Sequence, residues 1–183
     1  VRFSGDTILE AALPAMVSDS ELVAFMVMRP RETLSDSNAR FLSIMNSGLN
    51  TDTNANGIRP FMRNGNSARI QQQYQGSLGR FVDGAIDDTW ATYTSRISDL
   101  YDERLLKDGA ENVSERFANV NYTIDQIYLG GARSSTSGAY YADMDVVEVL
   151  VFDRTMVCSE IQLIENYFSY KYGITVSVKY PCS

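Results

Sequence analysis

Short strand-like segments separated by clusters of turn residues run along almost the whole chain, and this pattern limits the folds that it can adopt. The run Glu21–Arg31 is almost uninterruptedly apolar, and its β-branched and aromatic residues favour a strand buried on both faces. Further strand-like segments are Arg40–Met45, Ala68–Tyr74, Trp90–Ile97, Leu100–Leu106, Ile124–Leu129 and Val146–Phe152. Most of the chain is therefore predicted to be β-structure.

Only one segment has a convincing helical period. From Ser159 to Tyr172 the apolar residues fall on one stripe, and Gly173 follows where a helix ends. An α/β fold would need a helix after most strands. The pattern therefore predicts an all-β fold, an antiparallel two-sheet β-sandwich with one C-terminal α-helix.

The length of 183 residues suits one domain, residues 1–183, without a linker or repeat. No stretch approaches the roughly 18–20 apolar residues of a membrane span. The N-terminus lacks the basic start and apolar core of a signal peptide. Because the chain begins without Met and at a strand-like segment, we expect it to be part of, or processed from, a longer protein.

The chain contains no histidine, which excludes several kinds of catalytic and metal site. Ser-His-Asp and Cys-His arrangements and imidazole-ligated zinc or haem all need that side chain. Lys and Arg number 16 against 23 Asp and Glu, a formal net charge of −7. That balance argues against sequence-independent nucleic-acid binding and against docking to anionic lipid.

Two cysteines, Cys158 and Cys182, flank the helical segment. We expect a disulfide between them, which would tie down the C-terminal tail and indicate an oxidising compartment; two unrelated thiols are the alternative. Asn112 and Asn121 begin two sequons, Asn-Val-Ser and Asn-Tyr-Thr, and are candidate glycosylation sites. Both features point to an extracellular setting.

The last third of the chain resembles the laminin-G-like, or concanavalin A-like lectin/glucanase, superfamily. The resemblance lies in Leu129-Gly130-Gly131, the strand Met144–Val149, the turn Phe152-Asp153-Arg154 and the segment Glu165–Ile174. Met144 takes the place of the usual Gly. Val157 and Cys158 replace the usual helix-opening Ser or Asp.

The resemblance implies a two-sheet jelly roll with a curved, partly open sheet. It implies structural roles for Glu148, Tyr167 and Tyr172, with Glu148 reaching backbone donors and the tyrosines packing the helix on the sandwich. A Ca²⁺ site using Asp143 or Asp145, as in some relatives, is an alternative that the sequence leaves open.

Carbohydrate sites combine an aromatic plane with amides, carboxylates or guanidinium groups that bind hydroxyls. The candidate glycan-binding residues are Tyr140, Tyr141, Arg133, Gln71, Gln73 and Asp143, with Gln75 extending the glutamine row. The alternative interpretation is that the tyrosines pack and that the glutamines form a solvated sheet face.

Three functions remain to be weighed. The favoured one is a non-catalytic carbohydrate-binding or adhesion module on an extracellular, cell-surface or virion surface, with a glycan as its partner. The second is a structural module that contacts other subunits of a virion or surface filament. The third is a β-glucanase-type hydrolase using Asp143, Asp145 and Glu148, although Glu148 faces away from the other two carboxylates unless a β-bulge intervenes.

Overall fold

The apolar run predicted as a doubly buried strand is β3 (Glu21–Pro30), which lies inside one of two six-stranded sheets. The structure is a computed structural model that describes residues 1–4, 7–18, 21–31, 38–46, 57–63, 68–74, 77–98, 104–113, 122–132 and 140–176. Leu22, Met26 and Met28 of β3 point into the core between the sheets. Val23 and Phe25 point to the opposite face, where a second core lies. Two apolar partners explain why β3 shows no polar alternation.

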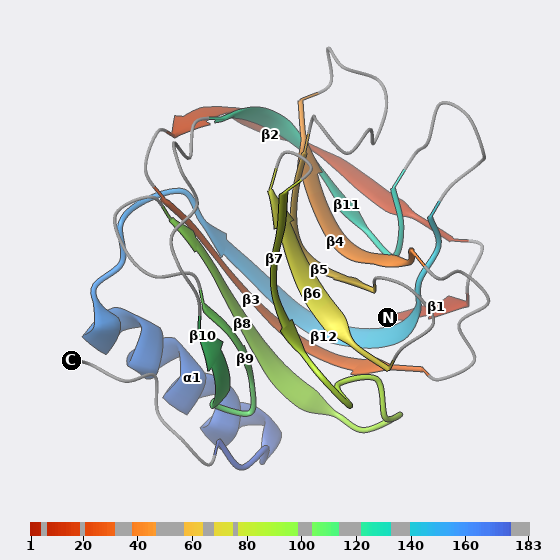
Figure 1. Cartoon of the computed structure of the whole chain (residues 1–183), viewed down its shortest axis with the longest axis vertical. Helices are drawn as coiled ribbons and strands as arrows, with labels where there is room; N and C mark the ends of the chain where they lie inside the picture. The colour runs from red at the N-terminus through yellow and green to blue at the C-terminus, as the bar shows by residue number, and fades with distance from the viewer. Residues whose placement is uncertain are drawn as a thin grey trace.

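The two sheets stack as a curved sandwich (Figure 1). Sheet A has the order β1-β12-β3-β8-β9-β10 and sheet B the order β2-β11-β4-β5-β6-β7, with antiparallel pairing. The other strands of sheet A are β1 (Arg2–Ser4), β8 (Ala91–Ser98), β9 (Arg104–Lys107), β10 (Ala110–Val113) and β12 (Asp143–Phe152). The strands of sheet B are β2 (Leu9–Ser18), β4 (Arg40–Met45), β5 (Gly57–Arg63), β6 (Ile70–Tyr74), β7 (Ser77–Val82) and β11 (Tyr122–Leu129). The predicted all-β sandwich is confirmed.

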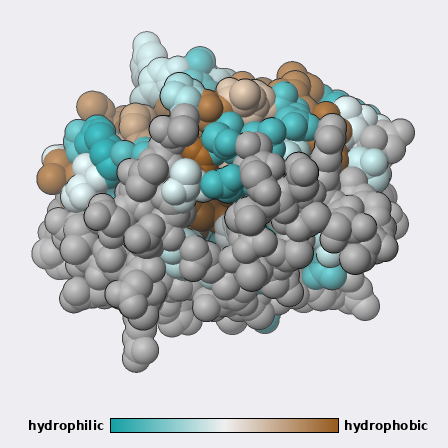
Figure 2. Space-filling model, turned by 90° about the horizontal axis from the view of Figure 1, so that it is seen from above, coloured by the Kyte–Doolittle hydropathy of each residue, from teal (hydrophilic) through white to brown (hydrophobic). Residues whose placement is uncertain are grey.

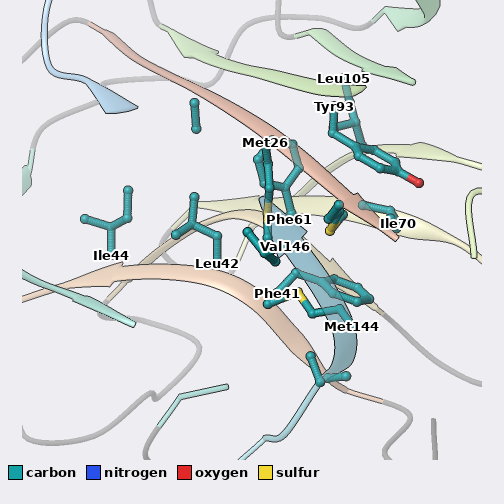
Figure 3. Close-up of a cluster of buried hydrophobic side chains, with 14 of the residues drawn as sticks. Met26, Phe41, Leu42, Ile44, Phe61, Ile70, Tyr93, Leu105, Met144 and Val146 are labelled. Carbon is teal, nitrogen blue, oxygen red and sulfur yellow. The ribbon is translucent and has the colours of Figure 1, made fainter. Parts of the chain in front are cut away.

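Side chains from both sheets meet in the main core (Figure 3). Phe61 from sheet B packs edge-on against Tyr93 from sheet A, with ring centroids 6.2 Å apart. The buried Tyr93 hydroxyl donates to the carbonyl of Ala85 at 2.8 Å, which satisfies its polar atom. The other labelled residues from sheet A in Figure 3 are Met26, Leu105, Met144 and Val146.

The helix α1 (Cys158–Tyr172) lies on the outer face of sheet A (Figure 1). Ile161 and Phe168 pack against Phe25 in the second core. Val157 offers no side-chain cap at the start of α1; instead the Glu160 carboxylate accepts the Val157 N–H at 3.0 Å. Gly173 ends the helix with φ of 67°, as the sequence predicts.

Of the two helix tyrosines expected to pack on the sandwich, Tyr172 does so, because it lies against the second core. Tyr167 does not bury its ring, which is 42% exposed. Among the described residues, no helix is long and apolar enough to span a membrane.

Candidate functional site

The outer face of sheet B, turned away from the core, carries the predicted glutamine row. Ile70 and Tyr74 of β6 point into the core. Gln72 reaches across the core, and its amide donates to Ser95 Oγ at 2.7 Å. Since side chains alternate along a strand, Gln71 and Gln73 lie on the opposite face.

Gln71 and Gln73 are both buried, so these two side chains form neither the predicted open sugar-binding row nor the solvated face that is its alternative. Gln73 Oε1 accepts a hydrogen bond from Arg59 Nη1 at 2.8 Å, and these two residues are register partners on β5 and β6. The amide of Gln73 therefore holds a guanidinium group. Gln75 lies outside the described residues.

Arg59 is fully buried, although most arginines in proteins are exposed. Burial, with a further contribution from the nearby Arg40 cation, lowers the pKa of Arg59 to about 9, which leaves it charged at neutral pH. Arg40 starts β4 and is also buried; its guanidinium carbon lies 4.6 Å from the centre of the Tyr140 ring. The backbone carbonyl of Tyr140 accepts the Arg40 N–H at 3.2 Å.

Tyr140, Arg40, Arg59 and Gln73 therefore form one connected group, which we call the arginine cluster. It joins an aromatic ring, two cations and an amide, the groups that bind a glycan or an anion. Tyr140 and Tyr141 at its margin are half-buried. Among the described residues of the cluster, Tyr140 and Gln73 are predicted from the sequence and the two arginines are not.

The other predicted residues are not brought into this cluster. Asp143 begins β12 on sheet A, opposite Ser4 of β1, and its carbonyl accepts the Arg31 N–H at 3.0 Å. Arg133, Asn121 and Cys182 lie outside the described residues, and so does the side chain of Asn112 on β10. The disulfide, the sequons and the role of Arg133 thus stay predictions.

A β-bulge changes how the carboxylates of β12 are arranged. The register with β3 shifts between Val146 and Glu148, which turns Glu148 to the same outer face of sheet A as Asp145. Asp145 accepts hydrogen bonds from Arg29, at 3.0 Å from its Nε, and from Arg31. Burial alone would raise the pKa of Asp145, but the two arginines outweigh it and hold the pKa below its ordinary value.

Glu148 is engaged by side chains of α1, not by the backbone donors expected from the resemblance. The hydroxyls of Tyr172 and Tyr167 donate to it at 2.6 and 3.2 Å, and the Lys171 ammonium at 2.9 Å. Burial alone would raise its pKa, but the Tyr172 and Lys171 hydrogen bonds outweigh burial and lower it. Glu148 thus links β12 to the end of the helix.

Replacing Glu148 by Gln is expected to lower the free energy of unfolding by about 1–2 kcal/mol at pH 7, since charge-assisted hydrogen bonds are lost. The folded-state pKa of Glu148 lies below its ordinary value. The stability difference from wild type is therefore fully present above about pH 4.3, the pKa of Glu in the unfolded chain. It shrinks as the pH falls through the lower pKa that Glu148 has in the folded protein.

Urea unfolding at pH 7, 5, 4 and 3 measures this dependence. Tyr172→Phe, which removes only the shortest hydrogen bond, should show a smaller loss that fades over the same pH range. A Glu148→Gln difference that stays constant down to pH 3 would contradict the expectation.

The described part of the chain contains no cluster of metal-binding side chains. No group of three or more His, Cys, Asp or Glu side chains there could hold an ion. Asp145 is occupied by two arginines, as described above. A calcium site at Asp143 or Asp145 stays a prediction.

The two arginines of the cluster carry a signal that sequence reasoning could have used. Arg40 stands directly before Phe41-Leu42, and Arg59 stands between Ile58 and Pro60-Phe61. An arginine that is buried in such an apolar segment must be paired or hydrogen-bonded, because an unpaired buried charge is costly. Their meeting with Tyr140 depends on strand register, which the sequence does not display.

Comparisons with known proteins identify the fold. No protein-family model matches the chain, and no curated protein does. Solved structures do match. The globular domain of T. cruzi calreticulin aligns with a TM-score of 0.60 at 12% identity, covering 94% of this chain and 78% of that one.

Two further structures share the architecture. The CBM40 of Ruminococcus gnavus IT-sialidase, bound to α2,3-sialyllactose, has a TM-score of 0.60 at 12% identity, with 81% of this chain and 83% of that chain covered. Domains LG4-5 of the mouse laminin α1 chain give 0.55 at 12% identity, with 84% of this chain covered but 42% of the laminin chain. The two-sheet jelly-roll fold implied by the resemblance is thereby confirmed.

Proposed function

We propose that this concanavalin A-like sandwich is a non-catalytic carbohydrate-binding module that takes a glycan at the Tyr140 margin of the arginine cluster. The observation that carries the proposal is the grouping of Tyr140, from the segment before β12, with Arg40, Arg59 and Gln73 of sheet B, the sheet that α1 does not cover. An aromatic plane beside hydrogen-bonding groups suits a sugar ring.

The charge of the cluster favours an acidic glycan. Arg40 and Arg59 are buried, so they act on a ligand at Tyr140 and Tyr141 through their field more than by direct contact. A low-dielectric surrounding strengthens that field. A similar fold is seen with a sialylated trisaccharide in the CBM40 structure, and this supports a sugar bearing a carboxylate.

The non-catalytic part of the proposal is supported by the carboxylates of β12. A retaining glycosidase needs one carboxyl group with a raised pKa to act as the acid. Asp145 and Glu148 share a face, but both have lowered pKa values and are held by cations. Release of reducing sugar from laminarin would contradict this part of the proposal.

We place the module on an extracellular, cell-surface or virion surface. The support is the expected disulfide at Cys158 and the acidic balance of 16 basic to 23 acidic residues, which suits a solvated exterior.

Glycan-array binding tests the function. We expect the wild type to bind acidic glycans, and Tyr140→Ala to weaken binding at least about tenfold because the stacking plane is lost. Tyr140→Phe should retain binding because it keeps that plane. Tyr170→Ala is the matched control, since Tyr170 is a solvent-exposed tyrosine on α1.

Two array results would overturn the proposal. One is a wild type that binds no glycan. The other is equal binding by the wild type and Tyr140→Ala, which would place any sugar site elsewhere.

A second candidate function rests on the exposed side of α1. Leu163, Tyr167 and Tyr170 are all exposed, and their spacing of four and three residues puts them on one stripe. Figure 2, by contrast, shows hydrophobic and hydrophilic described residues interspersed on the face seen from above. The exposed stripe on α1 favours a structural module that contacts other subunits. If the protein sediments as a monomer and binds glycans, the carbohydrate-binding function is favoured instead.

A further inference from the structure

A small pocket lies on the outer face of sheet A, where α1 ends. It has a volume of about 210 Å³ and is lined by Val27, Trp90, Val147, Tyr172 and Ile174. Trp90 is 39% exposed and Val147 is 48% exposed. The β-bulge of β12 places Val147 there, and the end of the helix supplies Tyr172. The pocket is separate from the arginine cluster, whose β4, β5 and β6 residues belong to sheet B.

The turn before β8 fixes the position of Trp90. Asp87 Oδ1 accepts hydrogen bonds from the hydroxyl and the N–H of Thr89 at 2.7 and 3.3 Å. The Asp88 N–H donates to the carbonyl of Pro30 at 3.1 Å, which attaches the turn to β3. The guanidinium carbon of Arg29 lies 5.6 Å from the Trp90 ring centre. Trp90 is therefore a preorganised aromatic surface at the edge of the pocket.

The charges around the pocket are paired with one another. Arg29 and Arg31 both bind Asp145, and Lys171 binds Glu148 at 2.9 Å. This local compensation offers no net field to an ionic ligand. The complementary ligand is uncharged.

Two of the lining residues are in contact with polar groups. The Tyr172 hydroxyl donates to the Glu148 carboxylate at 2.6 Å and also has a hydrogen bond with Lys171. The Arg29 guanidinium lies over the Trp90 ring. An aromatic face with hydrogen-bonding groups beside it is the arrangement that a sugar ring uses, whereas an aliphatic side chain needs only the apolar floor.

We propose that this pocket is a second ligand site, which binds one uncharged pyranose ring stacked on Trp90. Its volume lies below the range of about 300–1,000 Å³ typical of drug-sized ligands, which matches a single ring. The ring's C–H face lies against Trp90 and Val147, and its hydroxyls face the Tyr172 hydroxyl and the Glu148 carboxylate beside it. The site stands independently of the acidic-glycan site on sheet B.

Trp90 is the only tryptophan of the chain, so its fluorescence reports on the pocket directly. The titrants are the methyl glycosides of glucose, galactose, mannose and N-acetylglucosamine. We expect at least one of them to shift the emission saturably and to protect Trp90 from quenching by acrylamide. Charged monosaccharides should bind no better than these.

Val147→Lys should weaken the binding about tenfold or more, because it introduces a charge and bulk at an exposed position of the pocket wall. Leu163→Lys is the matched control, an exposed aliphatic residue on α1 that lies outside the pocket lining. Circular dichroism and thermal unfolding establish that both variants fold. Tyr140→Ala should leave the Trp90 titration unchanged, which separates this site from the proposed function.

Three results would overturn the inference. The first is that none of the four glycosides protects Trp90. The second is that the Val147→Lys and Leu163→Lys variants bind a glycoside equally well. The third is that N-acetyl-leucinamide protects Trp90 where the glycosides do not, which would assign the pocket to an apolar side chain of a protein partner.

Discussion

Replacing Glu21 by Gln is expected to lower the free energy of unfolding by about 3 kcal/mol, because it leaves a buried cation without its counter-charge. Glu21 is fully buried at the start of β3, and its Oε2 accepts Arg96 Nη2 at 3.0 Å. Oε1 accepts the N–H of Met156 at 3.3 Å, and the Met156 carbonyl accepts the same Arg96 group. The pair thereby joins two strands of sheet A to the segment that leads into α1.

Burial raises the pKa of Glu21, and the Arg96 charge opposes that rise without cancelling it. The desolvation cost of this ion pair is therefore large. Gln keeps the shape of the side chain and creates no cavity, so the loss reports on the charge.

Urea unfolding at pH 7 measures the effect. The control is Asp83→Asn, which removes the exposed ion pair with Arg69 at 2.8 Å and should cost less than about 1 kcal/mol. Equal losses for the two variants would show that burial adds nothing to the value of the Glu21 pair.

A strand or helix can be predicted from the sequence when its own side chains follow a recognisable hydrophobic pattern. β3 is predictable because both of its faces are apolar, and α1 because Ile161 and Phe168 share a stripe that ends at Gly173. β2 contains Pro14 between Leu13 and Ala15 and shows no alternation. It is a strand because β11 pairs with it from Leu9 to Ser18, and such a partner is visible only in three dimensions.

The candidate site likewise has features that the local sequence predicts and features that it does not. The composition around Tyr140 points to a sugar site, and the structure does place that ring beside polar groups. The burial of Gln73 and its bond to Arg59 follow from the register of β5 with β6. The bulge at Val147 likewise turns Glu148 towards the face of Asp145. Register and bulges depend on partner strands, so no local pattern reveals them.

Replacing Gly130 by Ala is expected to lower the free energy of unfolding by about 2–4 kcal/mol. Gly130 follows β11 with φ of +81°, and an added Cβ would lie 2.1 Å from Cδ1 of Phe3. The left-handed conformation costs a non-glycine residue about 1–2 kcal/mol, and overpacking costs about 1–3 kcal/mol. This gives a physical reason for the first glycine of Leu129-Gly130-Gly131 in the family resemblance.

Gly84→Ala separates the two contributions. Gly84 has φ of +64°, and an added Cβ there meets nothing within 4 Å, so it should cost only about 1 kcal/mol for the backbone. A loss at Gly130 no larger than the loss at Gly84 would mean that Phe3 moves aside freely.

A double-mutant cycle tests the contact itself. Phe3→Ala alone should cost about 3–5 kcal/mol, because Phe3 is buried in the main core. In the double variant the small side chain at position 3 makes room for the new Cβ, so the combined loss should fall short of the sum of the single losses. Additive losses in urea unfolding would show that the ring of Phe3 is not what requires glycine at position 130.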